Sequence, residues 1–174
     1  MNKRNFLIFI PIILIMGIFI RLVSGEPSNV QVKLDGLVCT FCAYNLEKKL
    51  KRVEAVEDLK ILVNAGLAEF KIKEGKSIDV DQIKKAVKDG GYTPREMLVT
   101  LNGRVEEASG RMILRIDDVS DSFILKDNEM LKEIITSEKA QDKTITVTGL
   151  VQEEKIKGHG IHPYVLEIKD FKFE

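Results

Sequence analysis

Short runs of alternating apolar and polar residues, separated by two segments of helical periodicity, organise the first half of this chain. The alternation predicts strands, and a repeat of apolar residues every three to four positions predicts helices. The strands are expected near residues 30–34, 59–63, 68–72 and 92–98, and the helices near 43–53 and 79–87. Asp79 is expected to cap the second helix, and Gly90-Gly91 to end it. Strand, helix, strand, strand, helix, strand is the order of the ferredoxin-like unit, which places two helices on one face of an antiparallel sheet.

The second half of the chain is predicted to be mostly strand, with one helix. Strands are expected near residues 99–105, 112–116, 123–125, 145–151 and 166–173, and Asp127 is expected to cap a helix before the last two. Three strands, a helix and two strands is the order of an OB-type small barrel, in which Gly103 and Gly149 would lie at sharp bends. The predicted fold class is therefore α+β: a ferredoxin-like domain at residues 29–97, followed without a linker by an OB-like β-barrel domain at 98–174. Residues 92–106 are expected to be nearly continuous strand, and the last strand is expected to switch faces at a bulge near Lys169-Asp170. This order of elements implies no function for the barrel.

The N-terminus has the pattern of a targeting or anchoring segment. Lys3 and Arg4 precede an apolar run from Phe6 to Ile20, and Val23-Ser24-Gly25 resembles a signal cleavage site. A membrane-spanning helix needs about 20 apolar residues, so the run is short for one. Residues 1–25 are predicted to be either a cleaved signal peptide or an N-terminal membrane anchor. Both alternatives place the rest of the chain outside the cytoplasm, in the periplasm or at the outer face of the cytoplasmic membrane.

Composition narrows the class of partner. The chain carries 27 basic and 27 acidic residues, for a formal net charge of zero. Proteins that must bind nucleic acid usually carry a basic surplus, so no nucleic-acid partner is expected. The sequence also lacks a G-x-S-x-G elbow and a phosphate-cradling glycine loop, and we predict no enzymatic activity.

The chemistry of the chain is expected to centre on Cys39 and Cys42, its only two cysteines. A C-x-x-C pair can hold a soft metal ion or exchange electrons as a disulfide. A purely structural disulfide is the third alternative. It would close so short a loop that it would restrict the unfolded chain little. The pair stands between a predicted strand and a predicted helix, and the helix N-terminus favours a thiolate.

Residues 30–97 resemble the heavy-metal-associated domain family, which includes copper chaperones, metal-pumping ATPase domains and the periplasmic mercury-binding protein. The family motif is G-M-x-C-x-x-C, and the segment from Gly36 to Cys42 reads G-L-V-C-T-F-C. The resemblance implies that Cys39 and Cys42 are the metal ligands.

The resemblance also implies three residues that lie near the two ligands. Leu37 stands where the family usually has methionine, and leucine can fill that space with little loss of apolar volume. Phe41 lies between the two thiols and could shield them. Tyr92 matches a position near the metal loop that bacterial members often fill with tyrosine.

The expected function is to bind a soft transition-metal ion and to transfer it to another protein. Two thiolates suit the near-linear coordination of Cu(I) or Hg(II), whereas Zn(II) normally takes four ligands, and Cd(II) is a further soft candidate. His159 and His162 are candidate extra ligands if their loop reaches Cys39, and otherwise two solvated loop histidines. The expected partner is a membrane metal transporter or another envelope protein. Two alternatives stay open: an envelope thiol-disulfide protein using the same cysteines, and an adaptor that binds an envelope protein through its barrel.

Overall fold

The computed structural model describes residues 28–37, 40–117, 119–137, 144–154 and 164–173. In chain order the elements are β1 (Asn29–Asp35), α2 (Thr40–Leu50), β2 (Val56–Leu62), the 3-10 turn η1 (Val63–Ala65), β3 (Leu67–Ile72), α3 (Val80–Asp89), β4 (Thr93–Ala108), β5 (Arg111–Ile116), β6 (Ser122–Leu125), α4 (Glu129–Thr136), β7 (Ile145–Glu153) and β8 (Tyr164–Phe173). The predicted signal or anchor at residues 1–25 lies outside the described residues. Among the helices of the described part, none combines the length and apolar character needed to cross a membrane.

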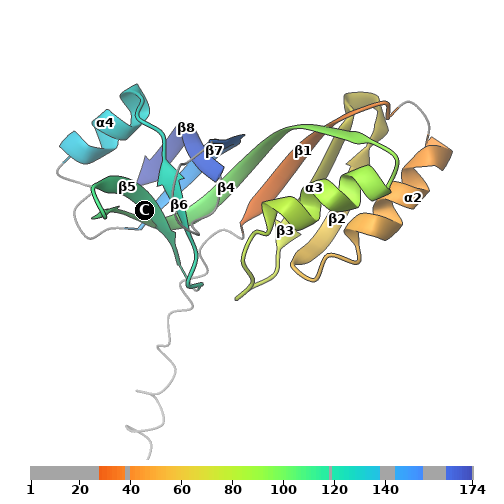
Figure 1. The fold of residues 1–174 in the computed structure, drawn as a ribbon, viewed down its shortest axis with the longest axis horizontal. Helices are drawn as coiled ribbons and strands as arrows, with labels where there is room; N and C mark the ends of the chain where they lie inside the picture. The colour runs from red at the N-terminus through yellow and green to blue at the C-terminus, as the bar shows by residue number, and fades with distance from the viewer. Residues whose placement is uncertain (1–27, 38–39, 118, 138–143, 155–163, 174) are drawn as a thin grey trace, which may run out of the picture.

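The first part of the structure is an antiparallel sheet in the order β2-β3-β1-β4, with α2 and α3 on one face (Figure 1). Alternation explains the layering, because Val30, Val32 and Leu34 of β1 are buried while the residues between them are half-buried or exposed. The same alternation continues in β3, where Ala68 and Phe70 are buried. The prediction of a ferredoxin-like unit is confirmed for this part of the chain.

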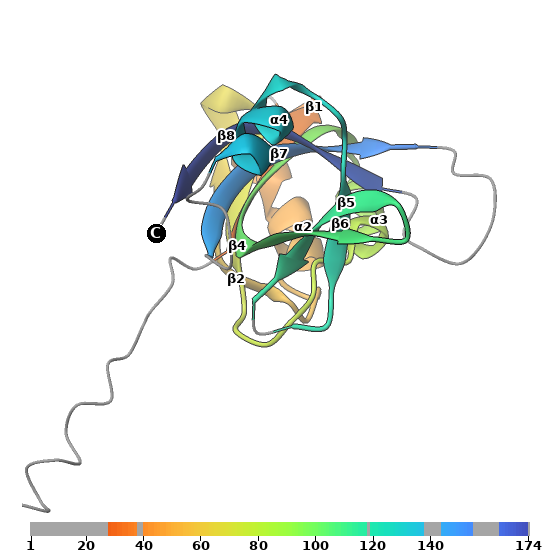
Figure 2. The ribbon, with the colours of Figure 1, turned by 90° about the vertical axis from the view of Figure 1, so that its left-hand side faces the viewer.

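The second part is a closed barrel of five strands, and Figure 2 views the molecule from this end. The strands follow one another as β4-β5-β6-β8-β7, and β7 pairs with β4 to complete the ring. All neighbours are antiparallel except β6 and β8, which are parallel. A register shift between β7 and β8 leaves Lys169 without a partner position, so the bulge expected near Lys169-Asp170 is present.

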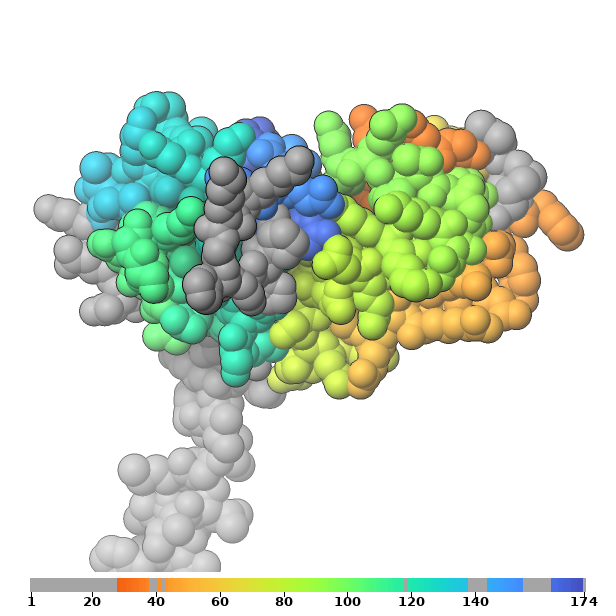
Figure 3. All heavy atoms as spheres, viewed as in Figure 1, coloured from red at the N-terminus to blue at the C-terminus, as the bar shows by residue number. Residues whose placement is uncertain are grey.

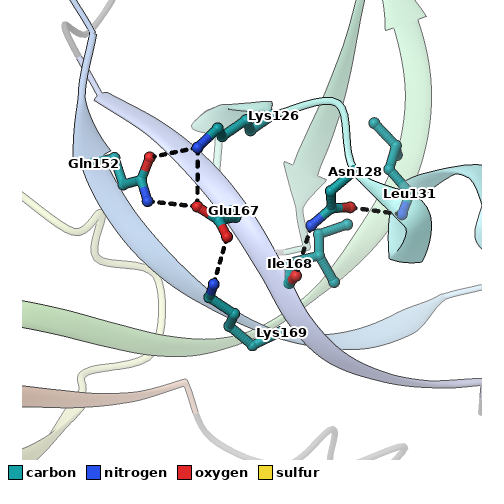
Figure 4. A network of polar contacts seen from close by, with 7 residues as sticks. All are labelled: Lys126, Asn128, Leu131, Gln152, Glu167, Ile168 and Lys169. Atoms are coloured by element: carbon teal, nitrogen blue, oxygen red, sulfur yellow. Dashed lines mark hydrogen bonds and ion pairs between the residues drawn. The ribbon is translucent and has the colours of Figure 1, made fainter.

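Helix capping confirms one sequence prediction and corrects another. Asp79 caps α3 as expected, because its side chain accepts a hydrogen bond of 2.8 Å from the backbone N–H of Gln82. Helix α4, however, is capped by Asn128 and not by Asp127. The side-chain oxygen of Asn128 accepts from the Leu131 N–H at 2.9 Å while its amide nitrogen donates to the Ile168 carbonyl at 2.8 Å (Figure 4). An ionised aspartate can accept but cannot donate, so only asparagine can both cap the helix and tie it to β8.

Strand β4 belongs to both parts of the structure. It runs unbroken for 16 residues, which confirms the expectation of nearly continuous strand over residues 92–106. Residues 97–100 pair with β1 on one side and with β7 on the other. The buried side chains of both parts also form one continuous apolar cluster. The predicted domain limits, 29–97 and 98–174, therefore divide a strand rather than a linker, and they stay a prediction.

A polar clasp joins α3 to the barrel beside the shared strand. The Tyr164 hydroxyl at the start of β8 donates a hydrogen bond to Asp81 of α3. Lys84, one turn further along α3, forms an ion pair of 2.9 Å with Glu153 at the end of β7. The Lys84 ammonium also lies 4.6 Å from the centre of the Tyr164 ring, within the range of a cation–π contact. The two parts are therefore connected by side chains as well as by backbone.

A second polar network ties β6, β7 and β8 together on the barrel (Figure 4). Glu167 accepts hydrogen bonds from Lys169 and from Lys126, the latter at 3.0 Å, and the amide nitrogen of Gln152 also donates to it. The bonds from Lys169 and Lys126 lower the pKa of Glu167 to about 2. This carboxylate is therefore ionised across the physiological pH range.

Replacing Gly103 with alanine should strongly destabilise the barrel. A Cβ at this position would lie 2.2 Å from the carbonyl oxygen of Arg115 in β5, so the two strands would have to separate. We expect a loss of about 3 kcal/mol in the free energy of unfolding. Gly110→Ala is the matched control: its φ of +73° is unfavourable for alanine, but no atom lies within 4 Å of the new Cβ. The control should lose only about 1 kcal/mol. Urea denaturation of the full chain measures both values, and equal losses would contradict the steric argument.

The hydrogen bond of Tyr164 in the clasp predicts that the protein becomes less stable at alkaline pH. Burial, and then the hydrogen bond to Asp81, raise the pKa of Tyr164 above its usual value. In the unfolded chain a tyrosine loses its proton near a pKa of about 10. The unfolded state therefore ionises first, and the contribution of Tyr164 to stability falls as the pH rises above about 10.

Tyr164→Phe should accordingly show a smaller loss of stability than the wild type between about pH 9 and pH 11. Urea denaturation at several pH values measures the slope, and Tyr44→Phe, a change at an exposed tyrosine, is the control. If the free energy of unfolding fell with pH as steeply in Tyr164→Phe as in the wild type, ionisation of the Tyr164 hydroxyl would not be the cause of the alkaline loss of stability.

Candidate metal centre

The candidate site lies where β1 ends and α2 begins. Gly36 follows β1 with a φ of +87°, a left-handed conformation that glycine adopts without strain. Cys39 lies outside the described residues. Cys42 belongs to the first turn of α2, and only its backbone is described. The exposed N–H groups of a helix's first turn favour a negative charge, which suits a thiolate at this place.

Two of the expected neighbours of the cysteines lie in opposite environments. Leu37 is buried, with 6% of its surface exposed, and belongs to the main apolar cluster. Phe41 is 93% exposed. A ring so exposed makes little contact with the rest of the protein, so Phe41 does not provide the shield considered from the sequence. Leu37 therefore anchors the start of the loop in the core, and Phe41 extends into solvent.

Tyr92, the third expected neighbour, lies beside the start of the loop. Its side chain is buried, and its Cδ1 atom would lie 3.9 Å from a Cβ placed on Gly36. Gly91, immediately before it, has a φ of +94° and turns the chain from α3 towards β4. The fold therefore brings Tyr92 next to a loop that is 56 residues away in sequence.

A close approach between α2 and the end of α3 fixes this arrangement. A Cβ on Gly90 would lie 3.0 Å from the Cα atom of Leu46, so glycine is needed for the two helices to approach this closely. The side-chain amide of Asn45 donates to the Gly90 carbonyl at 3.2 Å. Sequence reasoning treated Gly90 only as a helix stop and did not identify Asn45. Only the distance between the helices shows what these two residues do.

An ion pair holds the base of the loop on the sheet side. The Arg95 guanidinium donates to Asp35 at 2.5 Å, between the start of β4 and the end of β1. The hydrogen bond to this carboxylate raises the pKa of Arg95. The pair is exposed, so its main effect is on geometry rather than on stability.

The candidate extra ligands His159 and His162 lie outside the described residues. The described residues that border their loop, Glu153 and Tyr164, contact the first turns of α3. Tyr92 and the cysteine loop lie at the other end of that helix, which has 10 residues. Within the described part of the chain, no group of three or more histidine, cysteine, aspartate or glutamate side chains could hold a metal ion.

A groove of about 940 Å³ on the described surface does not border the candidate site. It lies across β2, β3, β1 and β4, and its lining residues are Asn29, Lys51, Asp58, Leu59, Lys60, Glu69, Phe70, Lys71 and Thr100. The groove contains no cysteine or histidine, and Asp58 is already paired with Lys71 at 2.7 Å. It offers no ligand set for a soft metal.

Comparison with solved structures finds similar proteins that cover only part of this chain. Oxidized MerP from Ralstonia metallidurans CH34 is 23% identical, over 39% of this chain and 94% of its own, with a TM-score of 0.35. The putative copper-ion-binding protein from Bacillus anthracis str. Ames is 21% identical, over 41% of this chain and 100% of its own, with a TM-score of 0.36. The N-terminal domain of PacS from Synechocystis PCC6803 is 21% identical, over 38% of this chain and 92% of its own, with a TM-score of 0.33. At these scores the similarities carry no functional argument.

No curated protein matches the chain. The family described as the heavy-metal-associated domain, however, matches residues 31–93. The matched segment includes Cys39, Cys42, Leu37, Phe41 and Tyr92, and it supports a general role in heavy-metal binding. Residues 31–93 of this protein are a heavy-metal-associated domain.

Proposed function

We propose that this protein binds one soft transition-metal ion through the thiolates of Cys39 and Cys42 and transfers it to another protein. The observation that carries the proposal is the position of the C-x-x-C pair. In the sequence, Cys39 stands between β1 and α2 and Cys42 stands in the first turn of α2, inside the segment that matches the heavy-metal-associated domain. Soft thiolates select Cu(I), Hg(II), Cd(II) and Zn(II), and a two-sulfur site best fits Cu(I) or Hg(II).

Transfer follows from an incomplete ligand set. Two thiolates leave room for the thiolates of a partner, which can bind the ion before the first pair releases it. The ion then never becomes free in solution. The exposed ring of Phe41 leaves that approach open, and a membrane metal transporter or another envelope protein is the proposed acceptor. The role is binding and delivery, with no chemical step for the protein to catalyse.

The remaining parts of the chain are assigned in the same proposal. Residues 1–25 act as a signal peptide or membrane anchor, so the described part works outside the cytoplasm. The barrel is of the OB type, and the strand order β4-β5-β6-β8-β7-β4 with a helix between β6 and β7 supports that assignment. The proposed domains are residues 29–97 and 98–174.

Metal binding should depend on both cysteines. The reduced full chain, kept free of oxygen, should bind Cu(I) and Hg(II) in a one-to-one ratio in competition with a chromogenic chelator. Cys39→Ser/Cys42→Ser should lose that binding, because a neutral hydroxyl is a poor ligand for a soft ion. His159→Ala/His162→Ala is the control and should bind Cu(I) and Hg(II) as the wild type does.

Equal binding by the wild type and the double-serine variant would end the proposal. A fall in Zn(II) affinity of the histidine variant would add His159 and His162 to the ligand set. If the cysteine pair bound no metal but catalysed thiol exchange with an oxidising potential, the redox alternative would replace metal transfer.

Leu37 should support the loop through its apolar volume. Leu37→Met keeps that volume and should cost less than about 1.5 kcal/mol, whereas Leu37→Ala leaves a cavity and should cost about 3 kcal/mol. Phe41→Ala removes a larger side chain from an exposed position and should change stability by less than about 0.5 kcal/mol. Urea denaturation of the metal-free chain measures all three values. A large effect of Phe41→Ala would show that its ring is buried in solution.

A further inference from the structure

The outward face of α2 carries an unusual pair of exposed aromatic side chains. Phe41 and Tyr44 are 93% and 70% exposed, more than any other large apolar side chain of the described residues. They are three residues apart, so they lie on the same side of the helix. The buried positions Ala43, Leu46 and Leu50 form the opposite side, which packs on the sheet. Neither ring contributes to the core.

Lys48 lies seven residues after Phe41 on the same side of α2, and it is exposed. Lys51 and Arg52, which are also exposed, belong to the turn that follows the helix. Glu47 is the one acidic residue between Thr40 and Arg52, and it is paired with Lys51 at 2.5 Å. The chain as a whole has no net charge, so this positive charge is local. We call Phe41, Tyr44 and Lys48 of α2, together with Arg52 in the turn after it, the α2 face.

The α2 face lies at the end of the molecule away from the barrel. Figure 1 shows α2 on the far side of the ferredoxin-like part, and in Figure 3 its atoms, in orange, form that end of the surface. The helix surface is convex, and no described element covers these side chains. A stable protein interface normally needs about 800 Å² from each partner, mostly contiguous. Two separate rings followed by basic side chains fit a lipid headgroup layer better, since it admits single aromatic rings and attracts positive charge.

The length of the chain allows this contact. The predicted apolar segment ends at Ile20, and β1 begins at Asn29. Eight intervening residues span at most about 28 Å. Strand β1, with 7 residues, is about 23 Å long, and α2 follows its far end. A chain held in the membrane by that segment can therefore lay the α2 face on the same membrane.

We propose that the α2 face docks on the surface of an anionic membrane. Phe41 and Tyr44 enter the headgroup layer, and Lys48 and Arg52 interact with anionic headgroups. Docking holds the start of α2, and with it the C-x-x-C turn, at the membrane plane. We expect this contact to be independent of metal binding.

The absence of tryptophan from the chain provides a direct test. Phe41→Trp places a single fluorophore on the α2 face at a position too exposed to disturb the fold. The full chain is reconstituted into vesicles of phosphatidylcholine alone or of phosphatidylcholine with phosphatidylglycerol. Ile135→Trp, on α4 of the barrel and 51% exposed in the wild type, is the control for tethering without contact.

We expect tryptophan at position 41 to shift its emission to shorter wavelengths, and to be quenched by brominated lipid, only on the anionic vesicles. The emission of tryptophan at position 135 should stay that of a ring in water on both kinds of vesicle. Adding Lys48→Gln and Arg52→Gln should weaken docking by about 30-fold, because two charges near the anionic surface are lost. Adding Cys39→Ser/Cys42→Ser should leave the shift unchanged, which separates this proposal from metal binding.

Three results would overturn the proposal. The first is an unshifted emission at position 41 on anionic vesicles, and the second is an equal shift on both kinds of vesicle. The third is a shift that appears with polyglutamate and not with lipid, which would assign the α2 face to an acidic protein instead.

Discussion

The double pairing of β4 is the constraint on which the rest of the structure depends. Residues 97–100 of this strand hydrogen-bond to β1 and to β7 at the same time. In an isolated unit with the order β2-β3-β1-β4, β4 would be an edge strand with one row of unpaired backbone groups. Here β7 satisfies those groups, and the barrel takes the place that solvent would otherwise occupy. A hinge between the two parts would break these hydrogen bonds and open a shared apolar core, so we expect the parts to move as one body.

The candidate metal loop is built from elements that this strand also positions. Tyr92, beside Gly36, immediately precedes β4, and Arg95 in β4 is paired with Asp35 at the base of the loop. Helix α3 has a similar double attachment: Gly90 at its end contacts α2, whereas Asp81 and Lys84 near its start contact the barrel. The surroundings of the cysteines are therefore fixed from one side by the same strand and helix that fix the barrel.

Local patterns predicted the elements well because the signals for them are local. The alternation of Val30, Val32 and Leu34, the cap at Asp79 and the stop at Gly90 each depend on a few neighbouring residues, and all three are present in the structure. The cap of α4 was predicted one residue early, at Asp127, because both Asp127 and Asn128 are good caps in isolation. What selects Asn128 is a second hydrogen bond, to Ile168, 40 residues away. The sequence likewise predicted a continuous β4 but not its second partner, since strand pairing is a long-range property.

The two sides of α2 differ in burial, and only one of them contributes to folding. Ala43, Leu46 and Leu50 are buried in the core. Phe41 and Tyr44 are exposed, so packing in the core does not determine which residues stand at these two positions. Large aromatic rings at such exposed positions bring the fold little stability, and they raise the risk of aggregation. Their presence next to the C-x-x-C pair therefore needs a reason outside the folded chain. The membrane docking proposed above provides that reason, because it removes both rings from water.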